Sequence, residues 1–248
     1  MKRHKKFYNK NFCLIIPARL SSSRLPNKVL MKIKNITILE YVYNICKKKI
    51  DERIIYIATP DIKIQELCRS KKIKFIKTSQ KCLTGTDRVC EASKKLNKKY
   101  IINVQADEIF LEPKNIINVC KEIIKNKYSV INCFGKIFNK SDFFSKSVPK
   151  VVVNEKKELI YISRAPIPSS KKIKFNECFK QICVYGFTKK SLKIFGKSLK
   201  KTFNEKYEDI EILRFLEKGI KVKMIKGKGS KLAIDTKEDF LMAKKILK

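Results

Sequence analysis

The feature that most constrains the fold is an unbroken apolar run from Phe12 to Ile16, which ends at Pro17. Its length is that of a strand, and a run without alternation suits a strand that is covered on both faces. Such strands are typical of parallel sheets with a layer of helices on either side. The run therefore predicts the first strand of an open α/β sheet.

A basic, hydroxyl-rich loop follows this strand. It carries Arg19, Arg24 and Lys28, with three serines between the two arginines, and Pro26 stiffens it. Open α/β sheets bind ligands at the carboxyl ends of their strands, so the cations predict a polyanion site that a triphosphate fits best. A solvated basic loop is the alternative in a chain this rich in lysine. Against it, two of only eight arginines lie within six residues here.

Strand-like and helix-like segments alternate along the rest of the chain. Helices are expected over 36–48, 62–72, 84–96, 114–125, 189–195, 205–219 and from 235 onward, and strands over 53–58, 74–77, 100–104, 129–134, 181–187 and 220–225, with a hairpin over 147–162. This alternation is the signature of a doubly wound parallel sheet. No repeat or flexible linker is visible, so we expect a basic tail over 1–11 and one domain over 12–248.

Two polar motifs follow predicted structure in the first half of the chain. Thr84 to Arg88 opens a helix with an N-cap threonine and backbone N–H groups free to bind an anion, although plain capping explains the same residues. The second, from Gln105 to Glu108, ends the strand over 100–104 and contains Asp107. An acid beside a triphosphate site holds Mg²⁺ readily, whereas a strand-ending turn acid is the other interpretation.

The second half of the chain offers weaker signals. Arg164 lies before two prolines that make a rigid connection. Glu205, Glu208 and Glu211 recur every third residue, a spacing that usually marks one solvated face of a helix. Asp235 precedes the last helix, and by residue type alone an N-cap is its best interpretation.

The net charge of +36 suggests nucleic acid or an anionic membrane as a partner. However, lysines are scattered without a basic arm, whereas nucleic-acid-binding proteins usually concentrate Arg and aromatic residues on one face. A compositional bias of the source genome explains the lysines better, and a basic field still attracts anionic substrates. His4 is the only histidine, which excludes a Ser-His-Asp triad and any multi-histidine metal site.

Cysteine spacing and hydropathy indicate the compartment. Nine cysteines without a CxxC pair predict buried free thiols in a reducing cytoplasm. No apolar segment approaches the ~18 residues needed to cross a bilayer, and no secretory signal follows the basic N-terminus. We therefore expect a cytoplasmic protein without a stably inserted membrane segment.

Five motifs in this order resemble the 3-deoxy-manno-octulosonate cytidylyltransferases, also called CMP-Kdo synthetases. They are IIPARxxSxRLPxKxL, TGTDR, NVQxDE, SRxxIP and xDTxED, and they span nearly the whole chain from residue 12. The resemblance implies a Rossmann-like nucleotide-diphospho-sugar transferase fold, with a mostly parallel central sheet, helices on both faces and a small dimerisation element. It also implies a homodimer that uses CTP and Mg²⁺ to make CMP-Kdo and pyrophosphate, with the sugar-side and dimerisation elements in residues 135–200.

The resemblance also assigns roles to individual residues. Asp107 and Asp235 would hold Mg²⁺. The other implied roles are the triphosphate clamp of Arg19, Lys28 and Arg24, the nucleotide contacts of Gly85, Thr86, Arg88 and Gln105, and the sugar pocket of Arg164, Gln181, Tyr185 and Glu211. The chemistry would be attack of the anomeric hydroxyl on the α-phosphorus of CTP, which depends on positioning and charge neutralisation and needs no histidine base.

Four positions depart from the family pattern. Gln181 replaces the expected histidine, Cys183 and Ala106 replace glycines, and Ile212 replaces a glutamine. Loss of hydrogen-bonding groups from a sugar pocket changes discrimination strongly. The acceptor could therefore be Kdo or an amino or deoxy variant of it. The alternatives are a cytidylyltransferase for a nine-carbon sialic-type acid, an inactive family member, or a non-enzymatic nucleic-acid-binding protein.

Overall fold

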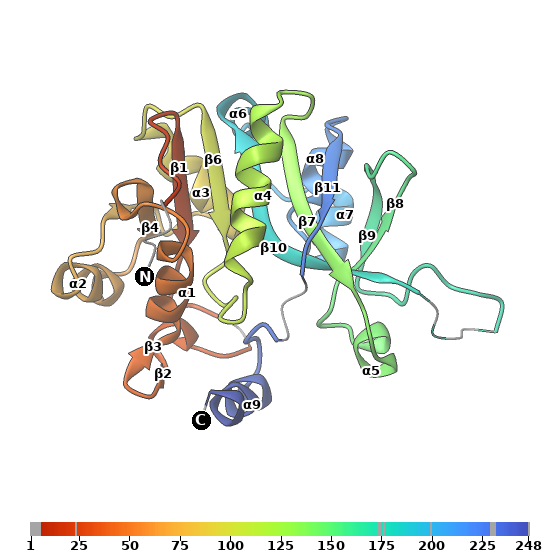
Figure 1. The fold of residues 1–248 in the computed structure, drawn as a ribbon, viewed down its shortest axis with the longest axis horizontal. Helices are drawn as coiled ribbons and strands as arrows, with labels where there is room; N and C mark the ends of the chain where they lie inside the picture. Colours follow the sequence, from red (N-terminus) through yellow and green to blue (C-terminus); the bar gives the residue numbers. More distant parts are fainter. Residues whose placement is uncertain are drawn as a thin grey trace.

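The computed structural model describes residues 6–22, 24–172, 175, 177–198, 200–228 and 232–247. Figure 1 shows the central sheet, whose strand order is β11-β7-β10-β6-β1-β4-β5. Its strands are β1 (Phe12–Pro17), β4 (Ile55–Thr59), β5 (Phe75–Lys77), β6 (Tyr100–Val104), β7 (Val130–Lys136), β10 (Phe179–Thr188) and β11 (Val222–Lys226). β10 is antiparallel to both neighbours and the other pairs are parallel, which confirms the predicted α/β fold.

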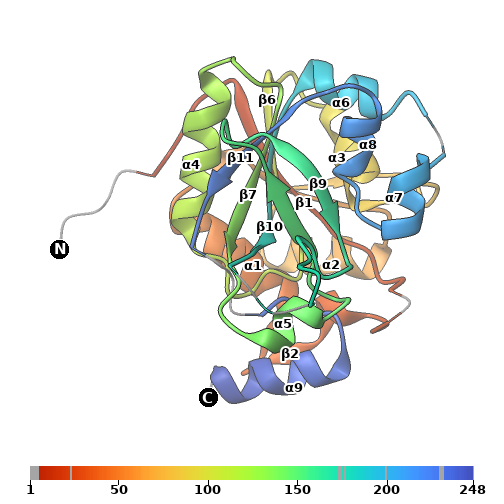
Figure 2. The same cartoon turned by 90° about the vertical axis from the view of Figure 1, so that its right-hand side faces the viewer.

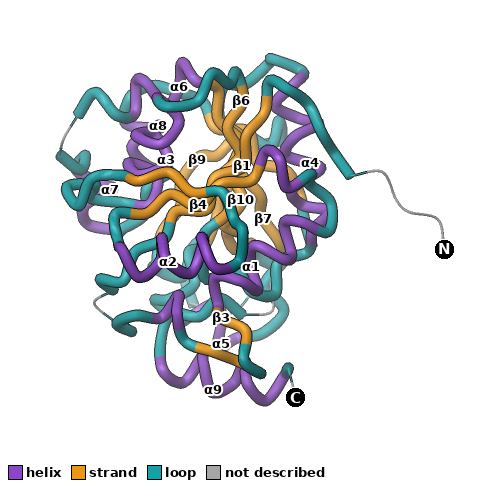
Figure 3. Tube along the Cα trace, turned by 90° about the vertical axis from the view of Figure 1, so that its left-hand side faces the viewer, coloured by secondary structure: helices purple, strands orange, loops and turns teal. Residues whose placement is uncertain are grey.

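β1 lies between β6 and β4 and is buried along its whole length. Its alternate side chains enter two hydrophobic clusters on opposite faces of the sheet, so the unbroken apolar run has the predicted cause. The first cluster includes α1 (Ile38–Lys47), α2 (Ile62–Ser70) and α4 (Pro113–Ile124), and the second includes α3 (Gly85–Lys94), α6 (Lys189–Phe195) and α8 (Leu213–Glu217). Figure 3 shows the strands enclosed between these layers.

Several small elements gather at the edge of the sheet where β1 and β6 end (Figures 1 and 2). They are the hairpin of β2 (Lys32–Ile33) and β3 (Ile36–Thr37), the short helix α5 (Lys140–Phe144) and the C-terminal helix α9 (Lys237–Ile246). The sequence patterns predicted α9 but neither the small hairpin nor α5. Of these elements, α5 and α9 each contribute a residue to the cleft described below, Asp142 and Asp239.

A second hairpin pairs with the beginning of β10, on the side of β10 that faces away from β7. It consists of β8 (Lys150–Val153) and β9 (Leu159–Ser163), which confirms the prediction for residues 147–162. β8 also pairs with the first residues of β10, Phe179 and Lys180. The hairpin therefore connects the segment before Arg164 directly to the central sheet.

The single helix predicted over 205–219 is wrong. The chain forms α7 (Phe203–Glu208), leaves helical geometry at Asp209 with φ of 50°, and resumes as α8. The spacing of the acids suggested one continuous solvated face, but all three bind partners inside the protein, as described below. The break at Asp209 is what turns Glu211 inward.

The N-terminal segment and the cysteines complete the fold. The segment expected as a tail is attached from Phe7, whose N–H donates to Lys49 O at 2.7 Å and whose carbonyl accepts from Asp51 N at 3.0 Å. All nine cysteines are free, seven of them buried, as predicted. Among the described residues, no helix combines the length and the apolar character that crossing a membrane requires.

Candidate active site

A cleft of about 480 Å³ opens at the carboxyl ends of β1 and β6, where open α/β sheets bind ligands. Its walls come from both ends of the chain and from the β8–β9 side of the sheet. All the predicted site residues except Thr86 line it: Arg19, Arg24, Lys28, Gly85, Arg88, Gln105, Asp107, Arg164, Gln181, Tyr185, Glu211 and Asp235. Thr86 is buried behind the wall, at 2% exposure.

The carboxylates of Asp107 and Asp235 meet at the ammonium group of Lys28. Lys28 Nζ donates to Asp107 Oδ2 at 2.7 Å, to Asp235 Oδ1 at 3.1 Å and to the carbonyl of Ile234 at 2.8 Å. Burial lowers the pKa of Lys28, but the attraction of the two carboxylates outweighs burial and raises it above its ordinary value of 10.5. Two acids far apart in the sequence thus lie together at the Lys28 ammonium group.

Local structure explains why Asp235 is available for this role. The N-cap of α9 is Thr236, which forms a capping box with Asp239, so the interpretation of Asp235 as the cap is wrong. The side chain of Asp235 instead accepts from Lys28 and, at 3.0 Å, from Arg24. Helix capping and cation binding are therefore divided between neighbouring residues.

The start of α3 forms the opposite wall of the cleft. Thr84 caps the helix, and a capping box with Asp87 confirms the predicted N-terminus. Gly85 lies close to its neighbours, since a Cβ there would be 3.1 Å from the Gln105 amide. This contact explains why a residue without a side chain stands at that point.

The N–H groups of α3 are not free, contrary to the prediction. Gly85 N and Thr86 N each donate to the Glu211 carboxylate at 2.8 Å, and the Thr86 hydroxyl donates to it as well. Burial raises the pKa of Glu211, and these hydrogen bonds offset only part of that effect. Glu211 therefore occupies the anion-binding position at this helix terminus and still lines the cleft.

Two arginines of the cleft wall are held by backbone carbonyls or hydroxyls. Arg88 Nη1 donates to Thr78 Oγ1 at 2.7 Å and to Ser79 O at 3.2 Å. Arg164 donates to the carbonyls of Lys146, Glu208 and Asp209, which lie in two different segments. In the described part of the chain neither guanidinium is bound to the acids at Lys28, although Arg164 Nη2 lies 3.9 Å from the Asp209 carboxylate. Both place a guanidinium group on the walls of the cleft.

A buried lysine binds the backbone carbonyl of Arg164. Lys150 is fully buried, and its ammonium group donates to Ser145 O at 2.8 Å and to Arg164 O at 2.5 Å. Burial lowers its pKa from 10.5 to about 8. The Glu208 carboxylate accepts from Arg164 N at 2.8 Å and from the Ser163 hydroxyl at 2.5 Å. The backbone around Arg164 is therefore fixed at both its N–H and its carbonyl.

Comparison with known proteins identifies the family. Residues 13–225 match the family described as cytidylyltransferase. The chain belongs to the cytidylyltransferase family. It is 36% identical to a 3-deoxy-manno-octulosonate cytidylyltransferase of Thermodesulfovibrio yellowstonii, over 94% of this chain and 96% of that one. It is 34% identical to the protein of the same name from Rickettsia prowazekii, over 97% and 96%.

Solved structures agree with this assignment. The cytidylyltransferase chain resembles the structure of CMP:2-keto-3-deoxy-manno-octonic acid synthetase complexed with CTP, with a TM-score of 0.86, 25% identity and coverage of 96% and 98%. It also shares its fold with a putative glucose-1-phosphate thymidylyltransferase from Bacillus anthracis, with a TM-score of 0.67, 15% identity and coverage of 95% and 94%. The Rossmann-like fold expected from the resemblance is therefore confirmed.

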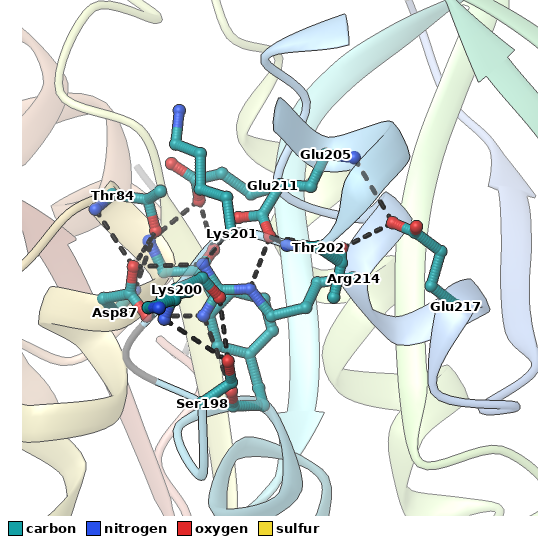
Figure 4. Close-up of polar contacts among 12 residues, drawn as sticks. Thr84, Asp87, Ser198, Lys200, Lys201, Thr202, Glu205, Glu211, Arg214 and Glu217 are labelled. Atoms are coloured by element: carbon teal, nitrogen blue, oxygen red, sulfur yellow. Dashed lines mark hydrogen bonds and ion pairs between the residues drawn. The ribbon is translucent and has the colours of Figure 1, made fainter. Parts of the chain in front are cut away.

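A buried ionic network behind the cleft of this cytidylyltransferase was not predicted. Arg214 has no exposed surface and binds both Glu205 oxygens at 2.6 Å and Asp87 Oδ1 at 2.7 Å (Figure 4). Its guanidinium carbon lies 3.8 Å from the centre of the Phe195 ring. The network joins α7 and α8 to the capping box of α3, so it supports the segment that carries Glu211.

The four departures from the family pattern lie in different surroundings. Ile212 packs in the core at 2% exposure, and Ala106 is 6% exposed at the cleft floor. Gln181 and Cys183 line the cleft on β10. Burial raises the pKa of the Cys183 thiol well above its ordinary value of 9.0, so it stays protonated at neutral pH. Of the four, the substitutions at 106, 181 and 183 therefore line the cleft, whereas the one at 212 does not.

Proposed function

We propose that this chain transfers CMP from CTP to Kdo or a closely related 3-deoxy sugar acid and releases pyrophosphate. The observation that carries the proposal is the convergence of Asp107 and Asp235 on Lys28, in a cleft that the strand-end loop also lines with Arg19 and Arg24. The names of the full-length relatives and of the CTP-bound structure support the substrates.

The donor set fits a magnesium ion. Lys28 Nζ is a cation bonded to two hard carboxylate oxygens, and Mg²⁺ typically uses one or two carboxylates together with substrate phosphates and waters. Asp107 and Asp235 would hold the ion. Among the residues with described positions no group of three or more acidic, cysteine or histidine side chains forms a metal site, so the remaining ligands would come from CTP and water. When bound, Mg²⁺ neutralises phosphate charge and lowers the pKa of a coordinated hydroxyl.

The protein's own residues bind and orient the two substrates. Arg19, Arg24 and Lys28 would neutralise the charge of the triphosphate, and Lys28 would be free to do so if Asp107 and Asp235 held the metal. Gly85, Arg88 and Gln105 form the wall proposed to contact the nucleoside, whereas Thr86 acts through Glu211 from behind it.

The sugar acid is proposed to lie against β10 and Arg164, whose positive charge pairs with its carboxylate. Tyr185, Gln181 and Glu211 are the polar groups on that side of the cleft. The anomeric oxygen attacks the α-phosphorus of CTP, a P–O bond forms, the bond to pyrophosphate breaks and the hydroxyl proton passes to water. Positioning and charge neutralisation supply the rate enhancement. A homodimer, a cytoplasmic location and a place in surface polysaccharide synthesis are further parts of this proposal.

Pyrophosphate release by the purified protein tests the proposal. We expect release with CTP, Mg²⁺ and Kdo or an amino or deoxy variant of Kdo, and much slower release with UTP or with a nine-carbon sialic acid. Asp107→Asn should lower kcat by at least about a hundredfold, because it removes charge stabilisation at the reacting phosphate. Asp51→Asn, which breaks an ion pair with Arg53 outside the cleft, is the control and should retain activity. No release with any 3-deoxy acid would refute the proposal.

A further inference from the structure

β10 contains an irregularity at the floor of the cleft. Ile182 pairs with Cys133 and Tyr185 pairs with Asn132, although Cys133 and Asn132 are neighbours on β7. Two residues of β10, Cys183 and Val184, are therefore extra relative to β7. In Figure 1, β10 lies between β7 and β6, so this bulge is in the middle of the sheet and not at its edge.

The side chain of Asn132 replaces the ladder hydrogen bonds that the bulge interrupts. Its Nδ2 donates to Ile182 O at 3.0 Å and to Val184 O at 2.9 Å, and the residue has no exposed surface. Because only the amine end of an amide donates, two carbonyl partners fix its orientation. The oxygen of the Asn132 amide must then face the other way.

The orientation of Asn132 in turn fixes that of Gln181. Asn132 Oδ1 accepts from Gln181 Nε2 at 3.0 Å. Since an oxygen at this point requires a donor, the amide nitrogen of Gln181 is held towards β7. Gln181 lines the cleft, so its carbonyl oxygen is the acceptor left for a ligand.

The other edge of the bulge binds the motif around the predicted metal ligand. Cys183 N donates to Glu108 Oε1 at 3.3 Å, and Cys183 O accepts from Gln105 N at 3.2 Å. Glu108 and Gln105 flank Asp107 in the sequence. The bulge is thus held on one side by β7 and on the other by the segment that carries a carboxylate of the cation site.

The bulge determines what the sugar side of the cleft presents. Gln181, Cys183 and Tyr185 are alternate residues of β10, and all three line the cleft. Alternate residues of a strand share one face, so a change in the length or position of the bulge would displace the three side chains together.

We propose that Asn132 is the positioning residue of the β10 wall. It holds the bulge and orients the Gln181 amide so that its carbonyl oxygen accepts a hydrogen bond from a hydroxyl or amino group of the sugar acid. This inference rests on the proposed function and assigns the acceptor specificity of the enzyme to a residue that does not itself line the cleft.

Steady-state kinetics of Asn132→Leu test the proposal. We expect KM for the sugar acid to rise about tenfold, the effect of losing a hydrogen bond of ordinary strength, while KM for CTP changes less than about twofold. Gln181→Leu, at a partly exposed position, should reproduce the rise even if the first variant folds poorly. Asn132→Leu combined with Gln181→Leu should be no worse than either single change, because both remove one interaction.

Ser191→Ala is the matched control. Ser191 is also buried, and its hydroxyl lies within hydrogen-bonding distance of two backbone carbonyls, Ser129 O just before β7 and Thr188 O at the end of β10. Ser191→Ala should change neither KM for the sugar acid nor KM for CTP. The proposal would be overturned if Asn132→Leu raised KM for the sugar acid and KM for CTP equally. It would also be overturned if Ser191→Ala raised KM for the sugar acid but not KM for CTP.

Hydrogen exchange of the Gln181 side-chain amide separates this inference from the proposed function. The NMR signal of this side-chain amide is assigned by its loss in Gln181→Leu. Its hydrogens should exchange with solvent slowly in the wild-type protein and quickly in Asn132→Leu. If it behaves in this way while the wild-type protein releases no pyrophosphate, the positioning role is upheld and the proposed function is wrong. Equal exchange in both proteins would refute the positioning role.

Discussion

Replacement of Arg214 by methionine should destabilise the protein strongly. Among the residues that the structure describes, the guanidinium is the only positive partner of Glu205, which has no exposed surface, and it makes four hydrogen bonds to the carboxylates of Glu205 and Asp87. Removal of one member of a buried ion pair leaves an uncompensated charge and typically costs about 3–5 kcal/mol. For a chain of this size that loss corresponds to a fall in Tm of roughly 10 °C.

The structure also predicts which second change restores stability. In Arg214→Met, Asp87 keeps its bonds from the N–H and hydroxyl of Thr84, whereas the bonds that the Glu205 carboxylate keeps within the described ranges all come from Thr202. Adding Glu205→Gln removes the stranded charge, so the double variant should regain most of the lost free energy of unfolding. Glu205→Gln alone should be destabilising, because it weakens the pair without removing Arg214.

Urea unfolding of the four proteins measures these free energies. We expect the midpoint to fall in Arg214→Met and to recover in the double variant, with an unchanged slope of free energy against urea concentration. A loss below about 1 kcal/mol in Arg214→Met, which is the value of an exposed pair, would refute the reasoning. A double variant as unstable as Arg214→Met would contradict the assignment of the cost to Glu205.

Two further changes test the buried polar groups of the sheet. Asn103 is fully buried, and neither the nitrogen nor the oxygen of its amide has a hydrogen-bond partner among the described residues. Asn103→Leu should therefore raise the free energy of unfolding, measured by urea titration, by about 1–3 kcal/mol. A lower free energy of unfolding in the variant would show that the amide makes a stabilising contact. The pKa of Lys150 is about 8 in the folded protein and 10.5 ordinarily, so between these values the unfolded chain binds more protons and stability should rise with pH. Lys150→Met should lack that rise in thermal melts from pH 7.5 to 10.5, and an identical pH profile would contradict the shift.

The sequence predicted the parts of this protein that depend on local patterns. The apolar run at residues 12–16 required cover on both faces, and the threonines before α3 predicted its capped start. The resemblance then brought Asp107 and Asp235 together, which spacing alone could not do. Both acids have equally good local interpretations as turn or cap residues, and only the fold distinguishes these from a shared cation site.

The errors arose where a distant partner determines the role of a residue. Glu211 was predicted to line the sugar pocket, and it does line the cleft. Its hydrogen bonds to the start of α3, however, depend on the interruption of the helix at Asp209. The partner of Arg214 at Asp87 is likewise remote in the sequence. One signal was available: Asn103 and Asn132 are polar residues inside apolar strands, and both pair with Tyr185, which lines the cleft.

The most direct test of the account is whether Asp107 and Asp235 bind one divalent ion together. Electron paramagnetic resonance can count protein-bound Mn²⁺, used in place of Mg²⁺, in the presence of CTP. We predict that Asp107→Asn and Asp235→Asn each weaken binding at least about tenfold, that the double variant is little worse than either, and that Asp51→Asn has no effect. Unchanged binding, or independent and additive losses, would contradict a shared site.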